Sequence, residues 1–450
     1  MTLPEEISVP ENPTAPPPPR RSWRPLLMRL HFYAGILVAP FIVVAAVTGG
    51  LYAMAPTIER LAYGDLLHVE PSGRPVPLAD QAAAARNAYP HLAMTGMRPS
   101  AEASESTRIY FADPALDEEF RRAVFVDPYT ARVLGDEPTW LGYLPVSTFL
   151  DGLHRHLQLG EPGRIYSEVA ASWLWVVALG GLCLWLFRRG RVFTVARGLK
   201  GRARTLNWHG ATGVWLLAGL LFLSATGITW STYAGAHVSD IRTALNWQRP
   251  TMDPAPTSTA TVDPAGIDYD AVVHAAAGAG VRLPVEVALA PEAGAGVTVT
   301  EQDKPYRLTT NAATVDPATG SVISTLDYWR DYSVVAMLAD WGIRAHMGLL
   351  FGLLNQLVLL GIAVALVAVI VGGYRMWWLR RPTRGSAWAV GRAPLRGGLR
   401  KLSPWAAGAL VVTAVALGWF LPLFGIPLAA FVIVDLGIAA IKRAKAGSDA

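Results

Sequence analysis

Six apolar stretches divide the chain, and polar or basic sequence separates them. At about 1.5 Å per residue, a helix of roughly 20 apolar residues crosses a hydrocarbon core of about 30 Å. We therefore predict an all-α membrane bundle of six spans, at residues 30–55, 166–187, 208–230, 347–374, 404–421 and 423–441. The last two are separated by Pro422 and would form a hairpin over residues 404–441.

Polar sequence of soluble character follows the first span and the third span. Residues 56–150 and 260–335 contain helical patterns and short runs rich in β-branched residues. Each region also has a Val-Asp-Pro turn motif between two strand-like runs, at residues 126–130 and 315–320. The pattern predicts two α+β domains outside the cytoplasm.

The sequence repeats itself around four histidines. His31 opens the pattern His-x3-Gly-x12-Thr-Gly in the first span, and His209 opens the same pattern in the third span. His154 and His346 come shortly before the second and fourth spans. Each precedes, by the same interval, a Gly-x3-Trp sequence that begins near the end of that span. An ionisable side chain at a repeated depth in an apolar helix marks function by default, because it costs energy there.

The repeat and the charged residues together predict a topology. The two copies of the repeat cover residues 25–190 and 205–380. Arg and Lys cluster beside alternate ends of the apolar stretches, which places both termini in the cytoplasm. The Pro-rich residues 1–24 are predicted to be a disordered cytoplasmic tail, and residues 381–403 a cytoplasmic loop.

Composition agrees with a membrane protein and narrows the chemistry. Of the 450 residues 52% are hydrophobic and only 16% charged, with a mean hydropathy of +0.31, too apolar for an ordinary soluble protein of this size. The formal net charge is +5, but the basic residues flank apolar segments, so we expect no nucleic-acid binding. Cys183 is the only cysteine, which excludes intrachain disulfides, thiolate iron–sulfur sites and Cys-x-x-Cys-His haem attachment.

The predicted topology sorts the four histidines into two pairs. His31 and His209 stand at the inner ends of outgoing helices, and His154 and His346 come before the outer ends of returning helices. If the copies pack about a two-fold axis along the membrane normal, each pair faces across it. Two facing imidazoles without cysteine are typical of a six-coordinate b haem, so we predict two haems. Zinc is the weaker alternative, because no third ligand recurs at the same level.

The outer pair is less clearly defined. His156 lies about 200° round a helix from His154, so both can hardly face one porphyrin, and the repeat favours His154. Arg155 and Arg344 flank this pair and are candidates for binding haem propionates. The interval from His346 to Trp377 would measure about 46 Å as one helix, longer than the hydrocarbon core. The histidines at 68, 91, 237 and 274 have no partner in the repeat and are expected at the solvated surface.

Four short motifs recur together: Leu-His-x3-Gly from Leu30 to Gly35, Thr-Gly near the end of the first span, Leu-His-Arg-x-Leu at residues 153–157, and the Val-Asp-Pro-x-Thr-Gly turn. In these motifs the chain resembles the PepSY-associated transmembrane family over about residues 25–380. It departs from the pattern at Ala131, where the first turn lacks its glycine.

The resemblance implies a function as well as a fold. The polar regions would be PepSY-like modules, and the nearest functional type is a ferric-siderophore reductase of the bacterial cytoplasmic (inner) membrane. Such proteins are implied to hold two b haems through histidines, here His31, His209, His154 and His346, and to deliver electrons to ferric iron or a ferric siderophore outside the cytoplasm.

Two other functions remain open at this stage. No Gly-x-Gly-x-x-Gly fingerprint follows a strand in a cytoplasmic segment, so electrons would come from quinol, a flavin or a partner reductase. The first alternative is a non-enzymatic PepSY membrane protein that binds peptides or regulates an extracytoplasmic protease. The second is a haem or iron-siderophore permease, in which Asp435 would be the coupling carboxylate.

Overall fold

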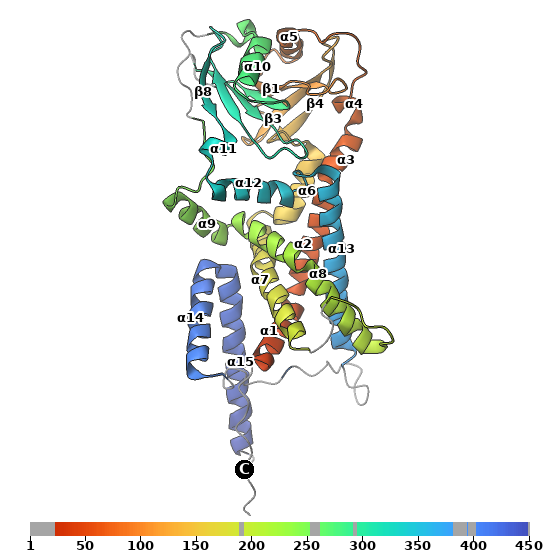
Figure 1. The fold of residues 1–450 in the computed structure, drawn as a ribbon, viewed down its shortest axis with the longest axis vertical. Helices are drawn as coiled ribbons and strands as arrows, with labels where there is room; N and C mark the ends of the chain where they lie inside the picture. The colour runs from red at the N-terminus through yellow and green to blue at the C-terminus, as the bar shows by residue number, and fades with distance from the viewer. Residues whose placement is uncertain are drawn as a thin grey trace, which may run out of the picture.

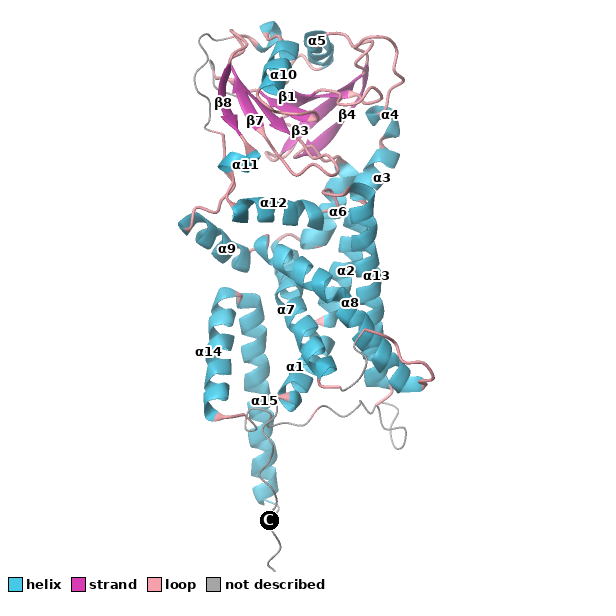
Figure 2. Cartoon of the chain, viewed as in Figure 1, coloured by secondary structure: helices cyan, strands magenta, loops and turns pink. Residues whose placement is uncertain are grey.

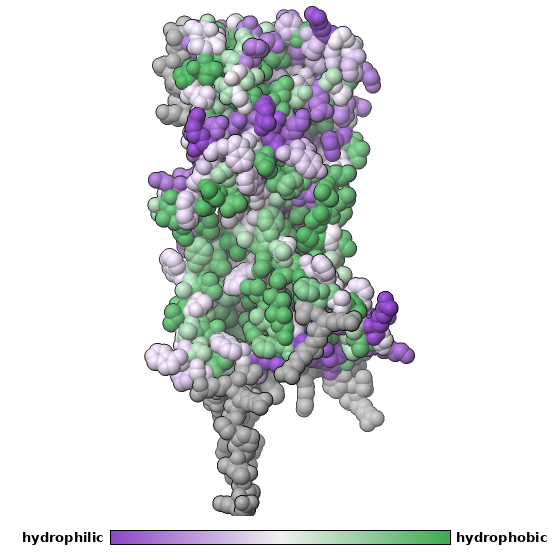
Figure 3. Space-filling view, viewed as in Figure 1, coloured by the Kyte–Doolittle hydropathy of each residue, from purple (hydrophilic) through white to green (hydrophobic). Residues whose placement is uncertain are grey.

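The computed structural model describes residues 23–188, 193–252, 262–290, 295–380, 394 and 402–448. A bundle of long apolar helices carries a single β-sheet at one end, and the C-terminal helices lie beside the bundle (Figure 1). Apolar side chains cover the surface of the helical part, and polar side chains gather where the bundle meets the sheet (Figure 3). The predicted tail at residues 1–24 lies outside the described residues up to position 22, as does most of the predicted loop at 381–403.

Four helices are long and apolar enough to cross a membrane: α7 (Glu161–Leu186), α8 (Gly201–Thr229), α13 (Gly352–Trp378) and the first part of α15 (Pro422–Ser448). They confirm a multi-pass membrane protein. The predicted span at 30–55 is two helices, α1 (Arg24–Leu37) and α2 (Ala39–Ala53), bent by 58°. Pro40 stands at the start of α2, where its missing N–H and fixed φ favour a new helix.

The described part of the chain therefore contains four candidate spans, or five if α1 and α2 are one broken span. The fifth predicted span, at 404–421, is α14 (Pro404–Phe420), which is apolar but only 17 residues long. It packs against α15, and the two form the predicted C-terminal hairpin (Figure 2). Six spans thus remain a prediction.

The fourth span begins later than predicted. Helix α12 (Val334–His346) ends at the histidine, and α13 begins at Gly352. Between them Gly348 and Gly352 adopt positive φ values of 80° and 58°, which favour glycine. The predicted start of the span at residue 347 is therefore wrong, because the chain turns here and α12 lies across the end of the bundle (Figure 1).

The two α+β regions form one domain instead of two. Their strands make a single antiparallel sheet in the order β4-β3-β2-β1-β5-β6-β7-β8, in which β1 pairs with β5. The strands are β1 Ala93–Arg98, β2 Thr107–Ala112, β3 Phe120–Val126, β4 Val133–Trp140, β5 Val285–Ala288, β6 Val297–Glu301, β7 Ala312–Val315 and β8 Val322–Leu326. A short edge would otherwise expose unpaired N–H and C=O groups on each half, and pairing the halves removes two such edges.

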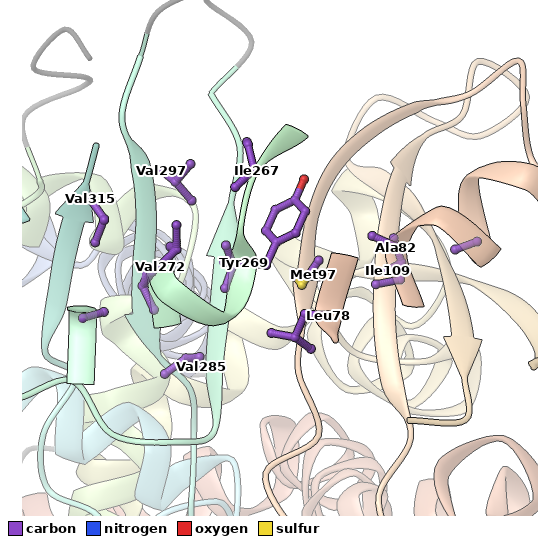
Figure 4. Packing of buried hydrophobic residues seen from close by; sticks show 14 of the residues in the cluster. Leu78, Ala82, Met97, Ile109, Ile267, Tyr269, Val272, Val285, Val297 and Val315 are labelled. Atoms are coloured by element: carbon purple, nitrogen blue, oxygen red, sulfur yellow. The ribbon is translucent and has the colours of Figure 1, made fainter. Parts of the chain in front are cut away.

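One hydrophobic core lies under both halves of the sheet. Helices α5 (Leu78–Ala88) and α10 (Tyr269–Gly278) cover the face away from the bundle (Figure 1). Buried residues of both halves pack into one cluster, in which Met97 and Tyr269 lie near the middle (Figure 4). Asp270 of α10 also accepts a 2.8 Å hydrogen bond from the backbone N–H of Leu78 in α5. Separating the two halves would therefore expose this shared core to water.

Both Val-Asp-Pro motifs form the predicted turns between strands. Asp127 and Asp316 each accept a hydrogen bond from the backbone N–H two residues later, at 2.8 and 2.9 Å. Gly320 has a φ of 68°, and Ala131 adopts a φ of 54° at the corresponding place. The turn geometry is therefore kept despite the missing glycine, at the usual steric cost of a left-handed alanine.

Short helices connect the sheet to the bundle. On the N-terminal side these are α3 (Ala55–Ala62), α4 (Gly64–Leu67) and α6 (Pro145–His156). On the C-terminal side they are α9 (Tyr233–Ala244), η1 (Pro264–Gly266), α11 (Tyr328–Asp331) and α12. Of these helices, α6 carries His154 and α12 ends at His346.

We predict that Gly96→Ala will destabilise the joined sheet. A Cβ atom at Gly96 would collide with the backbone carbonyl oxygen of Val287, where β1 meets β5. Overpacking of this kind costs about 1–3 kcal/mol. Thermal unfolding of the purified protein, followed by tryptophan fluorescence, should show a lower midpoint. Gly278→Ala is the control, since a Cβ there meets nothing within 4 Å. Equal midpoints for the two variants would contradict the shared sheet.

Candidate functional site

The inner pair consists of His31 on α1 and His209 on α8. Their ring centres are 6.2 Å apart, with the ring planes at 77°. The Nδ1 atom of His31 lies 3.0 Å from the carbonyl oxygen of Val177, and that of His209 lies 2.9 Å from the carbonyl oxygen of Val369. A carbonyl oxygen only accepts, so Nδ1 carries the hydrogen in both neutral rings. The Nε2 atom of each ring is left with a free lone pair.

Glycines surround the inner pair. A Cβ atom at Gly181 would lie 3.0 Å from Cε1 of His31, and one at Gly373 would lie 3.6 Å from Cε1 of His209. These glycines let each ring lie against the opposite helix. Gly35 and Gly213 stand one turn after the two histidines, and a Cβ at either would meet nothing within 4 Å. Open space therefore lies beside the helix face that carries each imidazole.

The outer pair consists of His154 on α6 and His346 at the end of α12. Their ring centres are also 6.2 Å apart, with the planes at 43°. Nδ1 of His154 lies 3.1 Å from the hydroxyl of Thr48, and Nδ1 of His346 lies 2.5 Å from the hydroxyl of Thr226. The ring centres of the inner pair and of the outer pair are thus equally far apart.

The threonine hydroxyls fix the same tautomer as the carbonyls at the inner pair. Thr48 donates its own hydrogen to the carbonyl oxygen of Val44, and Thr226 to that of Phe222, each at 2.8 Å. The hydroxyl hydrogen is therefore engaged, and the oxygen accepts from Nδ1–H of the histidine. Thr48 and Thr226 belong to the repeated Thr-Gly motif, but sequence reasoning gave them no role.

The outer imidazoles are neutral as well as oriented. Desolvation lowers the pKa of His154 to about 4. Desolvation, and after it the charge of His154, lowers the pKa of His346 to about 3. A neutral ring with Nδ1–H engaged offers Nε2 as a ligand at neutral pH.

His154, and not its neighbour, lies against His346. His156 makes no ring contact with another histidine among the described residues, and its buried Nδ1 has no hydrogen-bond partner there. The break after α12 holds His346 in place, because Asn355 donates a 2.8 Å hydrogen bond to the carbonyl oxygen of Ala345.

The two flanking arginines are engaged by carboxylates. Arg155 lies 3.3 Å from Asp151 and stacks over Trp140, yet it also lines the cavity at the outer pair. Arg344 is buried and lies 2.6 Å from Asp303 and 3.4 Å from Asp340. Its contacts assign Arg344 to the junction of sheet and bundle, since Asp303 follows strand β6.

Other single residues differ in part from expectation. His68, His91 and His274 are exposed, as predicted. His237 is not a free surface residue, because it stacks on Trp419 with ring centres 5.1 Å apart and its Nδ1 lies 2.9 Å from the carbonyl oxygen of Phe420. It joins α9 to the C-terminal hairpin.

A cavity of about 190 Å³ touches the outer pair. Its walls come from α2, α7, α8 and α13 and are mostly apolar, including Ile42, Ala46, Leu223, Ile362 and Leu366. Arg164 and Glu168 are polar groups at its rim, and Glu168 accepts two 2.9 Å hydrogen bonds from the backbone at the start of α9. The cavity thus combines apolar walls with a few fixed polar groups, as ligand sites do.

A larger cleft of about 660 Å³ lies between the sheet and the bundle. It shares Tyr52 and Met347 with the cavity at the outer pair, so the two spaces adjoin. Its charged lining residues are Arg60, Arg98, Arg108, Glu59, Glu105 and Asp303. Burial, and after it the charge of Arg98, lowers the pKa of Arg108, so two guanidiniums lie close together here.

No group of three or more His, Cys, Asp and Glu that could hold a metal ion is present among the described residues. In this part of the chain each histidine pair therefore stands without the third and fourth protein ligands that a structural zinc ion requires.

A comparison with protein families was made on the whole chain. The model described as "PepSY-associated TM region" matches residues 28–380, from just before His31 to just after α13. The chain belongs to the PepSY-associated transmembrane family. No curated protein sequence matches it. In this family member both histidine pairs, the sheet and helices α2, α7, α8 and α13 all lie inside the matched region.

We predict that Thr226→Val will weaken metal-centred binding at the outer pair of this PepSY-associated protein. Valine keeps the shape but removes the oxygen that accepts from His346, and losing such a support typically costs about 10–100-fold in affinity. Titration of the metal-free protein with haem, followed by visible absorbance, measures the effect. Thr226→Ser retains the hydroxyl and should bind like wild type. Equal affinity for the Val and Ser variants would show that the contact does not orient the ring.

Proposed function

We propose that this PepSY-associated membrane protein holds two b haems and conducts electrons through the membrane to ferric iron or a ferric siderophore on its outer side. The observation that carries the proposal is the 6.2 Å separation of ring centres in both histidine pairs. Two imidazoles that each place a nitrogen about 2 Å from a shared metal have ring centres roughly 6 Å apart. Two neutral, pre-oriented histidines on opposite sides are the ligand set of a b haem.

The chain's own residues support both sites. Backbone carbonyls hold Nδ1 of His31 and His209, and threonine hydroxyls hold Nδ1 of His154 and His346, which leaves four Nε2 atoms as ligands. Gly35 and Gly213 leave room beside the inner pair for a flat ring system. When bound, a haem supplies a reversible one-electron change at iron, which neither a histidine nor an apolar helix offers.

The two pairs stand at different levels of the bundle. His209 and Thr226 are 17 residues apart in the continuous helix α8, which corresponds to about 25 Å along its axis. Because Thr226 contacts His346, this length is close to the separation of the two levels. One pair therefore lies near each face of the bundle, as a conduit requires.

The cleft beside the outer pair is the proposed place of the ferric substrate. It adjoins the outer cavity and is lined by residues of both the sheet region and the bundle, and α1 lies at the other end of the bundle (Figure 1). With its arginines and aromatic residues such as Tyr143 and Tyr306, it suits a chelate with polar and planar groups. Electrons would enter at the inner pair from quinol, a flavin or a partner reductase.

The topology belongs to the same proposal. We infer six spans in an internal tandem repeat, both termini in the cytoplasm, and a bacterial cytoplasmic membrane. Arg188 and Arg380 follow the ends of α7 and α13, and these helix ends lie away from the sheet (Figure 1), which supports a sheet outside the cytoplasm.

The permease alternative loses its main candidate residue. Asp435 forms an ion pair with Arg29, which is itself buried and also donates to the carbonyl oxygen of Pro394 at 2.9 Å. This pair links α15 to α1, which gives the carboxylate a structural role. The peptide-binding alternative gives the histidines no redox role, so haem content distinguishes it from the conduit.

We predict a haem content of two per chain, and one in each single-site variant. His31→Ala and His209→Ala should lose the inner haem and keep the outer one, because the ligand sets are separate. Haem extracted and quantified per mole of protein, together with reduced-minus-oxidised spectra, measures the content. His274→Ala is the control, since that histidine is exposed on α10. Two haems per chain in both inner variants would show that the inner ligands are misassigned.

We further predict that His346→Ala will abolish reduction of external ferric chelates while the inner haem can still be reduced from the cytoplasmic side. His31→Ala should instead leave the outer haem oxidised with a cytoplasmic donor, yet reducible by external dithionite. Oriented vesicles with a membrane-impermeant Fe(II) trap separate these cases. Unchanged Fe(II) production by a His346 variant that lacks the outer haem would exclude the conduit.

A further inference from the structure

Four arginines stand in matched frames beyond the inner histidine pair. Arg24 precedes His31 by seven residues, and Arg202 precedes His209 by the same number. On the two returning helices, Arg188 follows Gly181 by seven residues, and Arg380 follows Gly373 by seven. These glycines are the ones that touch the inner imidazoles. Within a helix, seven residues are nearly two turns, or about 10.5 Å, so Arg24 in α1 and Arg202 in α8 lie below their histidines on the same helix face. Arg188 and Arg380 follow just after the ends of α7 and α13.

Three of these arginines converge. The charges of Arg380 and Arg188 act repulsively on Arg202, so the three guanidiniums lie near one another. Arg202 is half-buried, and its Nε atom is buried without a hydrogen-bond partner in the described part of the chain. A buried donor left unpaired costs about 1–3 kcal/mol, and like charges add to that cost. An anion between the arginines would offset both costs.

The neighbouring sequence does not supply that anion. Residues 188–204 and 379–403, which contain or adjoin the three arginines, include no Asp or Glu at all. Asp435 is paired with Arg29. The positive-inside rule accounts for basic residues at these helix ends, but not for a half-buried arginine whose Nε is enclosed near two other guanidiniums.

We propose that Arg202, Arg188 and Arg380 form an oxyanion site that binds the propionate carboxylates of a haem held by His31 and His209. This inference rests on the proposed function and names further residues for its inner site. A guanidinium binds a carboxylate through two parallel, charge-assisted hydrogen bonds, and a buried one does so more strongly than a solvated ammonium would. A phosphate of an anionic lipid has the same chemistry, and the experiment separates the two sources.

The test uses full-length protein carrying His346→Ala, in which the inner site is the remaining haem site. Haem b and haem b dimethyl ester, whose carboxylates are blocked, are titrated into the metal-free protein in nanodiscs with neutral lipid. Arg202→Gln should weaken haem b binding by about tenfold or more, the size expected for a lost charge-assisted hydrogen bond. The same substitution should leave the dimethyl ester unaffected.

Arg204→Gln is the matched control. Arg204 lies two residues on in α8, about 200° round the helix, and is exposed. It removes the same charge from the same end of the bundle, so it should change neither titration.

Each other result overturns the inference. Equal haem b affinity for Arg202→Gln and wild type would show that the arginine binds no propionate, while the haem-dependent function stands. Equal weakening of haem b and the ester would assign Arg202 a structural role. An effect that appears only with anionic lipid would assign the site to a lipid phosphate. Absence of any inner haem in the Arg202 wild-type background would instead defeat the proposed function itself.

Discussion

The hydrogen bond at Nδ1 of each central histidine is the interaction on which the site depends. An imidazole in an apolar bundle is useful as a ligand only if it is neutral and its free nitrogen faces the right way. Carbonyl oxygens of Val177 and Val369 fix the inner rings, and the hydroxyls of Thr48 and Thr226 fix the outer rings. Each contact comes from a different helix than the histidine, so helix packing and ring orientation stabilise each other.

That dependence explains the glycines and the broken helices. Gly181 must lack a side chain because His31 lies against it, and Gly49 does the same for His154, where a Cβ would be 2.8 Å from Cε1. The break between α12 and α13 turns the chain so that His346 faces the bundle from its end. The sheet then closes over this end as one continuous domain, and its cleft adjoins the outer pair.

The sequence was sufficient for what the repeat encodes. The apolar stretches and the strand-turn-strand motifs can be predicted from hydrophobic pattern and spacing, because these depend on local physics. The family is recognised by its resemblance in short motifs instead. The pairing of β1 with β5 did not, since it joins residues 96 and 288 and no local signal marks it. The bend at Pro40 and the turn at Gly348 leave no mark in the hydrophobic pattern, because a broken helix and a continuous helix have the same run of apolar residues.

The arginines beyond the inner pair carry no sign of anion binding in the sequence alone. At the end of a span, Arg188 and Arg380 satisfy the positive-inside rule and call for no other explanation. The structure adds that their charges act on Arg202 and that the Nε of Arg202 is buried. A charge that serves topology is free to lie anywhere in the interface, whereas a charge that binds an anion must converge with others on one point. The enclosed Nε of Arg202, near two other guanidiniums beyond the inner pair, is the feature that separates the two roles.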